Sequence, residues 1–459
     1  MKDFIENYWE KEVLPRLMEF GEIPNVSPAF DAHWETNGHM AQAARMLHDW
    51  VQSRDIADVV EIKHIQGRTP LLYIEIKGSR EGTVLMYGHF DKQPPLEGWR
   101  EGLHPWKPVR EGDYLYGRGL ADDGYSIFAA IGAIEAAKNV GAEIPRVVII
   151  IEGSEESGSD DLPEYLEMLK DDIGTPHTVI TLDAEGWDPE HLWLTDSLRG
   201  IVNGYLSVEI LDAPLHSGVA TGIVPSASRI MRQLIQRIED TETGMILDER
   251  VSPPIPAHVK EKFQQVAEVV GDEYIDAYNL PSYLQTVGSS IYDNVERNLW
   301  HAGMETVGMT GLPTTDKAGN VAHAKVEAKL SFRIPPTVDC KEAATALKEV
   351  LEKDPPYGAK VSFDAREMDN GWFSKPLSER GKEIIWETAK ETYKHEPIQT
   401  GLGASIPFIS MMAEQFPEAD NLVVGILSPS SNAHGPNENL HIPTVKRITE
   451  WTARFLTKI

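Results

Sequence analysis

Continuous apolar runs mark the first 200 residues and predict buried strands. The runs TVLMYG, VVIIIEG and HTVITLD are bounded by Gly, Pro or charged residues, which is typical of strands in a sheet covered on both faces. Residues 125–138 carry apolar side chains at helical spacing, and after residue 372 long helices return with one more buried strand, NLVVGIL. The pattern predicts an α/β fold with a mostly parallel sheet flanked by helices.

The middle of the chain has a different pattern, which predicts an inserted domain. Residues 200–211 and 321–333 alternate apolar and polar side chains, as strands with one solvated face do. Apolar helical stripes lie between and after them. We therefore expect an α/β domain made of residues 1–198 and 369–459, interrupted by a two-layer α+β domain over 199–368.

Size and charge narrow the classes of protein. The 459 residues are enough for two domains, and the net charge of −29 argues against nucleic acid or an anionic membrane as partner. No apolar run approaches membrane-spanning length, and the first residues are charged and amphipathic. One cysteine, Cys340, excludes an intrachain disulfide. We expect a cytoplasmic protein.

Histidines and carboxylates cluster at the ends of the predicted strands and in loops. The clusters are His89-Phe90-Asp91, Asp122-Asp123 in GRGLADDG, Glu155-Glu156 in EGSEESGS, Asp183 after HTVITL, and His434 in SNAHGPNE. Because parallel strands place their carboxyl ends at one edge of the sheet, we expect these clusters to converge. Two imidazoles with several carboxylates suit zinc, and the surplus of oxygen ligands indicates a pair of ions that share a carboxylate.

Each cluster taken alone also has a structural explanation. The pairs Asp122-Asp123 and Glu155-Glu156 could begin helices, with Ser154 or Ser157 as a cap. His434 could be an ordinary loop histidine. The occurrence of all five clusters in strand context favours the metal site over these explanations.

The order of motifs resembles one enzyme family over nearly the whole chain. The motifs are MYGHFD, YGRGLADD, EGSEESGS, Asp183, LHSGV, LSFR, GASIP and SNAHGPNE. They resemble the dinuclear zinc metallopeptidases, which include carnosinase-type dipeptidases, glutamate carboxypeptidase, aminoacylase and succinyl-diaminopimelate desuccinylase. The resemblance implies a zinc-exopeptidase-like fold and metal-dependent hydrolysis of an amide bond in dipeptides or short peptides.

The resemblance also implies roles for the clustered residues. His89 and Asp183 would hold one Zn²⁺, Glu156 and His434 the other, and Asp122 would bridge both ions. Asp91 would orient His89, and Glu155 would be the general base for a water activated between the two zinc ions. Mn²⁺ or Co²⁺ could occupy similar ligands.

The inserted domain is similar to the lid and dimerisation domain of that family, which implies a homodimer. His216 would stabilise the oxyanion, either in its own subunit or across the dimer. The implied substrate-binding residues are Asn320, Arg333, Gly403, Ser405 and Ile406. A surface salt bridge is the structural alternative for Arg333, and a helix cap is the alternative for Ser405.

Two departures from the family pattern leave the substrate open. The sequence Asp122-Asp123-Gly124-Tyr125 lacks a lysine that many relatives have there, and EMDNGWF over 366–372 lacks a histidine of some dipeptidases. A dipeptidase or carboxypeptidase is the leading prediction. An N-acyl amino acid deacylase or desuccinylase with the same metal centre, and a non-catalytic scaffold, are the alternatives.

Overall fold

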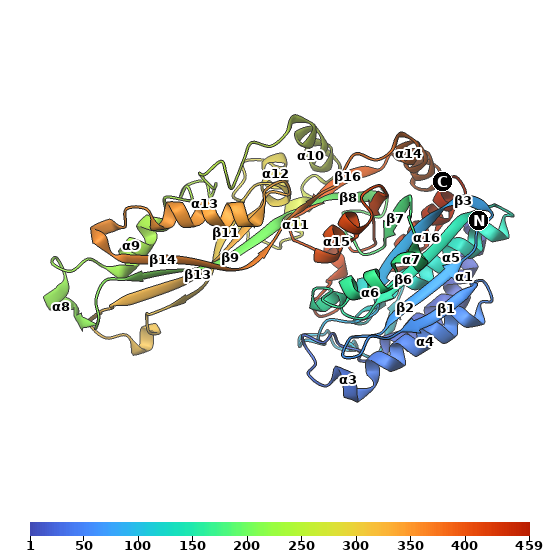
Figure 1. Ribbon diagram of the computed structural model, residues 1–459, viewed down its shortest axis with the longest axis horizontal. Coiled ribbons are helices and arrows are strands. Elements are labelled where there is room, and N and C mark those ends of the chain that lie inside the picture. The colour runs from blue at the N-terminus through green and yellow to red at the C-terminus, as the bar shows by residue number, and fades with distance from the viewer. The chain divides into compact units, whose positions relative to one another are not determined.

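The computed structural model describes residues 1–459, and the chain forms two compact units. Unit 1 comprises residues 1–195, 374–399 and 406–459, and unit 2 comprises residues 196–373 and 400–405. Figure 1 labels most of their helices and many of their strands. No helix is both long enough and apolar enough to span a bilayer.

Unit 1 is built on a mixed sheet whose centre is parallel. In spatial order its strands are β1 (Val59–Lys63), β2 (Leu71–Ile76), β6 (Pro145–Glu152), β3 (Arg80–His89), β7 (Thr178–Thr181), β17 (Asp420–Val423) and β8 (Trp193–Leu198). Strands β6, β3, β7 and β17 run parallel, whereas β1, β2 and β8 pair antiparallel at the two edges. This arrangement confirms the predicted mostly parallel sheet.

Helices cover both faces of this sheet. The helices of unit 1 are α1 (Lys2–Tyr8), α2 (Leu14–Gly21), α3 (Trp34–Asn37), α4 (His39–Ser53), α5 (Ser126–Asn139), α6 (Leu162–Met168), α7 (Lys170–Ile173), α14 (Glu379–Tyr393), α15 (Pro407–Gln415) and α16 (Ile442–Leu456). Apolar residues of α4, α5, α14 and α16 share one core with one face of the sheet. On the other face, Tyr87 of β3 stacks on Phe408 of α15, with ring centroids 4.1 Å apart. The helix predicted over 125–138 is α5, which is buried on nearly every side because it packs against both the sheet and α16.

A small antiparallel sheet joins distant parts of unit 1. Its strands are β4 (Val109–Glu111), β5 (Tyr114–Tyr116) and β18 (Asn439–His441). β18 pairs with β5, so the segment after His434 lies beside the segment that leads to Asp122.

Unit 2 has two layers, an antiparallel sheet and helices. The strands, in spatial order, are β11 (Gly303–Thr310), β13 (Lys325–Ile334), β9 (Gly200–Glu209) and β14 (Lys360–Asp369). Its helices are α8 (Ser217–Ala220), α9 (Ala227–Ile235), α10 (Ala257–Val270), α11 (Glu273–Asp276), α12 (Ile291–Leu299) and α13 (Cys340–Glu352). Apolar residues of α9 and α13 form a core with one sheet face, which includes Leu206 and Phe332. Lys329 and Asn203 bond to Glu367 on exposed parts of the same strands, so the alternation predicted for this sheet reflects one solvated face.

The strand predicted over 321–333 is two strands in the structure. β12 (Val321–Ala322) pairs with β10 (Leu215–His216) in a separate two-stranded sheet, and β13 begins only at Lys325. The expectation of one continuous strand was wrong because alternation persists through His323 and Ala324, and alternation cannot reveal a change of partner strand. The remaining strands, β15 (Trp372–Phe373) and β16 (Ile398–Leu402), pair with β8.

Candidate metal centre

Three neighbouring parallel strands are each followed by a candidate site residue. β3 ends at His89, a 3-10 turn over Glu155–Ser157 follows β6, and Asp183 comes two residues after β7. Because β3 lies between β6 and β7, the carboxyl ends of these strands are adjacent at one edge of the sheet.

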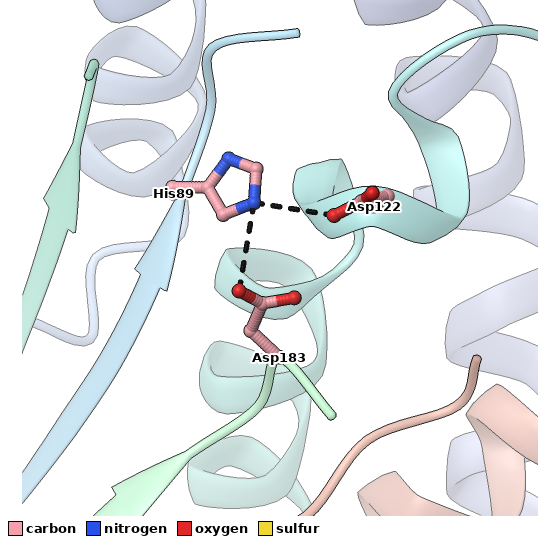
Figure 2. Close-up of side chains that lie close together, drawn as sticks. All are labelled: His89, Asp122 and Asp183. Atoms are coloured by element: carbon pink, nitrogen blue, oxygen red, sulfur yellow. Dashed lines mark ion pairs between the residues drawn. The ribbon is translucent and has the colours of Figure 1, made fainter. Parts of the chain in front are cut away.

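The first ligand group consists of His89, Asp122 and Asp183, all of them buried. His89 Nε2 lies 3.3 Å from Asp122 Oδ1 and 3.7 Å from Asp183 Oδ2. Figure 2 shows the imidazole at the strand end facing both carboxylates, which come from two other segments. The three ligand-type atoms lie within 4.8 Å of one another, which is close enough for one ion to contact them all.

The second ligand group consists of Asp122, Glu156 and His434. His434 Nε2 lies 3.0 Å from Asp122 Oδ2 and 3.2 Å from Glu156 Oε2. Asp122 therefore presents one carboxylate oxygen to each group, as a bridging ligand must.

Unpartnered buried atoms test whether these residues fit metal ions. His89 Nε2 and Glu156 Oε1 are buried, and neither atom forms a hydrogen bond. Such atoms are costly to bury without a partner, and both belong to the two ligand groups. Two imidazoles and three carboxylates are also ligand types that Zn²⁺ uses. The residues fit a pair of divalent ions.

Asp91 connects the ligand segments to one another. Its carboxylate accepts hydrogen bonds from the backbone N–H groups of Glu155, at 3.1 Å, and Glu156, at 3.0 Å. The same carboxylate lies 3.4 Å from His89 Nδ1. Asp91 is fully buried, so this one side chain holds the loop after β6 against the end of β3.

No side-chain cap accounts for the acidic pairs, although Glu155 and Glu156 do begin a 3-10 turn. Helix α5 begins without a side-chain cap, and Asp123 Oδ2 instead accepts a hydrogen bond from the backbone N–H of His89 at 3.1 Å. Ser154 does not cap the turn at Glu155, because its Oγ donates to Glu152 Oε2 at 3.1 Å. Ser157 Oγ accepts a hydrogen bond from the N–H of Ala29.

The carboxylates of this cluster are crowded. Burial raises the pKa of Asp183 to about 7 and holds the pKa of Glu155 well above its ordinary value. Burial alone would also raise the pKa of Asp122, but the adjacent imidazoles of His434 and His89 lower it. Hydrogen bonds with Asp122 and Glu156 raise the pKa of His434 to about 11. These shifts describe a cluster of negative charge that a bound cation would neutralise.

Glu155 lies beside the first ligand group without belonging to either group. Its Oε2 is 3.9 Å from His89 Nε2, and its side chain is mostly buried. The carboxylate is therefore within reach of the centre while the neighbouring Glu156 is engaged with His434.

One contact of the site was missed from the sequence. Gln93 Nε2 donates a hydrogen bond to Glu156 Oε2 at 2.5 Å. The only signal was the position of Gln93 four residues after His89 in HFDKQPP, and an uncharged side chain in a loop does not stand out there.

In unit 2, Arg333 and Ser405 lie together. Arg333 Nη1 is 3.4 Å from Ser405 Oγ, and Arg333 forms no ion pair, so the salt-bridge explanation for it is wrong. Ser405 does not cap α15, because no side chain caps that helix. The carbonyl of Gly403 accepts a hydrogen bond from Arg199 Nε at 3.0 Å.

The other two predicted residues of unit 2 are exposed. His216 Nδ1 accepts a hydrogen bond from the N–H of Gly218 at 3.1 Å, and the carbonyl of Asn320 accepts one from Ser217. His216 thus has one ring nitrogen satisfied locally and one available. Ile406 is partly exposed and precedes α15.

A parallel sheet that gathers imidazoles and carboxylates at its strand ends is the framework of a metal-dependent hydrolase. The sequence over residues 85–458 matches Peptidase family M20/M25/M40. The chain belongs to this family, and it is a hydrolytic enzyme of the metallopeptidase class. The predicted family and enzyme class are confirmed.

Individual relatives agree with this assignment. The chain is 26% identical over 380 residues to a cysteinylglycine-S-conjugate dipeptidase of Corynebacterium striatum, covering 82% of this chain and 80% of that protein. It is 28% identical over 371 residues to a Cys-Gly metallodipeptidase of Candida albicans, covering 78% of this chain and 75% of that protein. Among solved structures, an M20 metallo-carboxypeptidase of Sulfolobus solfataricus shares the fold, with a TM-score of 0.75 at 22% identity over 98% of this chain and 99% of that one.

Proposed function

We propose that this metallopeptidase hydrolyses the amide bond of dipeptides or short peptides at a centre of two metal ions. The proposal rests on the position of Asp122 between the two ligand groups. Its Oδ1 faces the group with His89, and its Oδ2 faces the group with His434. A carboxylate shared by two ligand groups suits a bridged pair of ions. Asp183 would complete the first group and Glu156 the second.

The metal ions and Glu155 would divide the chemistry between them. When bound, two Zn²⁺ ions, or Mn²⁺ or Co²⁺ on the same ligands, make a water molecule more acidic and polarise the amide carbonyl. Glu155 takes the proton of the attacking water and delivers it to the departing amine. Its place beside His89 but outside both ligand groups supports this role.

Asp91 would keep the base and the ligands in fixed relative positions. Its carboxylate binds the backbone of Glu155 and Glu156 and lies next to His89 Nδ1. A carboxylate in this position fixes the ring orientation of a ligand histidine and raises its basicity.

Unit 2 would serve as the lid and dimerisation domain. His216 would stabilise the oxyanion, in its own subunit or in the partner's. The substrate would be bound by Asn320, Arg333, Gly403, Ser405 and Ile406. The half-buried Arg333 guanidinium has no acidic partner, which leaves it available for a substrate carboxylate. The homodimer and the cytoplasmic location stay predictions.

The named activities of relatives favour dipeptides as substrates. The relatives from Corynebacterium striatum and Candida albicans are named for cysteinylglycine conjugates and Cys-Gly, and a human relative that is 26% identical over 288 residues is named for β-Ala-His. Removal of C-terminal residues from longer peptides is the next candidate, because the similar structure from Sulfolobus solfataricus is a metallo-carboxypeptidase.

A substrate panel on metal-reconstituted protein tests the proposal. The panel pairs Cys-Gly, β-Ala-His and Ala-Ala with N-acetyl and N-succinyl amino acids of matching side chains. We expect the dipeptides to have the higher kcat/KM. Faster hydrolysis of the N-acyl or N-succinyl compounds would instead identify a deacylase or desuccinylase with the same centre.

A further inference from the structure

The loop that carries His434 needs support from outside itself. Asn432, His434 and Asn437 have φ angles of +51°, +60° and +63°, in the left-handed region that residues with a side chain rarely adopt. The His434 side chain is 58% exposed, and its ion pairs are with Asp122 and Glu156. Little packing therefore fixes this imidazole, although it is a member of the second ligand group.

A buried ion pair joins this loop to the segment before Asp122. Arg118 Nη1 is 2.6 Å from Glu438 Oε2, and the two side chains are 1% and 0% exposed. No other ion pair made by an Arg or Lys in the protein is buried to this degree. Burying two charges costs much of what their attraction returns, so a fixed geometry is the main thing that such a pair supplies.

The guanidinium of Arg118 also contacts the backbone of the His434 loop and of one further loop. Its Nη2 donates to the carbonyl of Gly435 at 2.8 Å, and its Nε donates to the carbonyl of Pro94 at 3.1 Å. Gly435 adjoins His434, and Pro94 lies in the loop that follows His89. One planar fork thus joins the loop that carries His434 to the loop that follows His89.

The carboxylate of Glu438 holds the third loop. Its Oε1 accepts hydrogen bonds from the backbone N–H groups of Gly119, at 2.9 Å, and Leu120, at 3.2 Å. These residues lie three and two positions before Asp122. The backbone of Glu438 takes part too, because its carbonyl accepts a hydrogen bond from the N–H of Gly117 at 3.0 Å.

We propose that Arg118 and Glu438 are positioning residues that fix His434 against Asp122 and so set the affinity of the second metal ion. The inference rests on the dinuclear centre of the proposed function. Neither residue belongs to a ligand group, so both act through the loops that they join. The ion held by Asp122, Glu156 and His434 depends on them more than the ion held at His89, because His89 is a buried residue at the end of a central strand.

The test is a Zn²⁺ titration of the wild type and of Arg118→Lys. It measures the affinity of each of the two Zn²⁺ binding steps in both proteins. Lysine keeps the positive charge but cannot make the three contacts of the guanidinium fork. We expect one step to stay as in the wild type and the other to weaken about 10- to 100-fold, as for other residues that orient metal ligands. His434→Ala, which removes the ligand itself, should abolish the step that Arg118→Lys weakens.

A matched control separates positioning from general loss of stability. Glu135→Gln removes another ion pair of unit 1, in which Arg54 binds both carboxylate oxygens of Glu135 at 2.7 and 2.8 Å. Neither side chain has a hydrogen bond or ion pair with a ligand residue. This variant should lower the unfolding temperature while leaving both Zn²⁺ steps unchanged, with all titrations made well below the unfolding temperatures.

The outcomes separate this inference from the proposed function. Two unchanged Zn²⁺ steps in folded Arg118→Lys would overturn the inference. If that variant does not fold, Glu438→Gln, which keeps the shape of the side chain, is titrated instead. Two unchanged Zn²⁺ steps in Glu438→Gln would likewise overturn the inference. A wild type that binds two ions but cleaves no peptide refutes the proposed function and leaves the inference intact, whereas a wild type that binds no metal refutes both.

Discussion

At the residue scale, the adjacent glutamates after β6 have different surroundings. Glu156 contacts His434 and Gln93, whereas Glu155 lies 3.9 Å from His89 Nε2 and belongs to no ligand group. Two neighbouring carboxylates with the same backbone support from Asp91 can therefore have different tasks. Replacing a glutamate by glutamine changes one oxygen to an NH₂ group, so such variants can test proton transfer and metal binding separately.

The first prediction concerns the general base. Glu155→Gln should lower kcat by about 10²–10⁴, because an amide cannot accept the proton of the attacking water. The metal content, measured by elemental analysis, should equal that of the wild type. The control is Glu167→Gln on α6, whose side chain is 76% exposed and whose kcat should not change. A fully active Glu155→Gln enzyme would exclude Glu155 as the base.

The second prediction concerns Asp91. Asp91→Asn should weaken metal binding about 10- to 100-fold, since the amide is a poorer partner for His89 and can accept from only one of the two backbone N–H groups. Competition with a chelator measures the affinity. Asp58→Asn serves as the control, because Asp58 also accepts a backbone hydrogen bond, from Lys77, but at the edge of the molecule. Equal losses in both variants would contradict a specific role for Asp91.

At the element scale, apolar runs were sufficient to predict β3, β6 and β7, and with them the edge of the sheet where His89 and Asp183 lie. Strand ends can be predicted because a buried strand needs an uninterrupted apolar sequence. The break between β12 and β13 could not be predicted, since both segments keep the same alternation.

Contacts between segments far apart in sequence were also beyond prediction. Gln93 reaches Glu156 across the sheet edge, and Arg118 reaches Glu438, which lies 320 positions further along the chain. Neither pairing leaves a local periodic pattern, because both depend on where loops meet in the folded chain. The sequence could indicate the ligand types but not the side chains that hold the ligand loops in place.

The third prediction tests the packing of α13 in unit 2. Leu347 is 1% exposed and belongs to the core between α13 and the sheet. Leu347→Ala should lower the free energy of unfolding of unit 2 by about 2–5 kcal/mol, because it leaves a cavity. Thr345→Ala, at an exposed position of the same helix, should stay within about 0.5 kcal/mol of the wild type in denaturant unfolding. Similar effects in both variants would show that α13 is not packed as described.

At the scale of the whole molecule, the two units have separate cores, and both ligand groups belong to unit 1. A ligand that binds only the folded state stabilises the part of the protein that holds it. Metal binding should therefore stabilise the two units unequally.

The fourth prediction follows from this separation. Chelation should abolish activity, and Zn²⁺, Mn²⁺ or Co²⁺ should restore it. Calorimetry should show one unfolding transition that moves to lower temperature on chelation. The corresponding loss in the free energy of unfolding should be about 4 kcal/mol if metal had been present at 1,000 times its Kd. A second transition should stay in place and respond instead to Leu347→Ala. A single transition that moves with both treatments would show that the two cores unfold together.

The division of unit 1 along the sequence affects how the protein is made. Strand β17, which completes the parallel centre of the sheet beside β7, and the loop with His434 both follow unit 2 in the chain. Domains generally fold as units while the chain is being synthesised. On a translating ribosome, residues 196–373, which make up most of unit 2, would thus emerge as one stretch and fold while the sheet of unit 1 still lacks β17. The nascent chain would hold His89, Asp122, Glu156 and Asp183 without their last partner, so the proposed second metal ion could bind only after translation has passed His434.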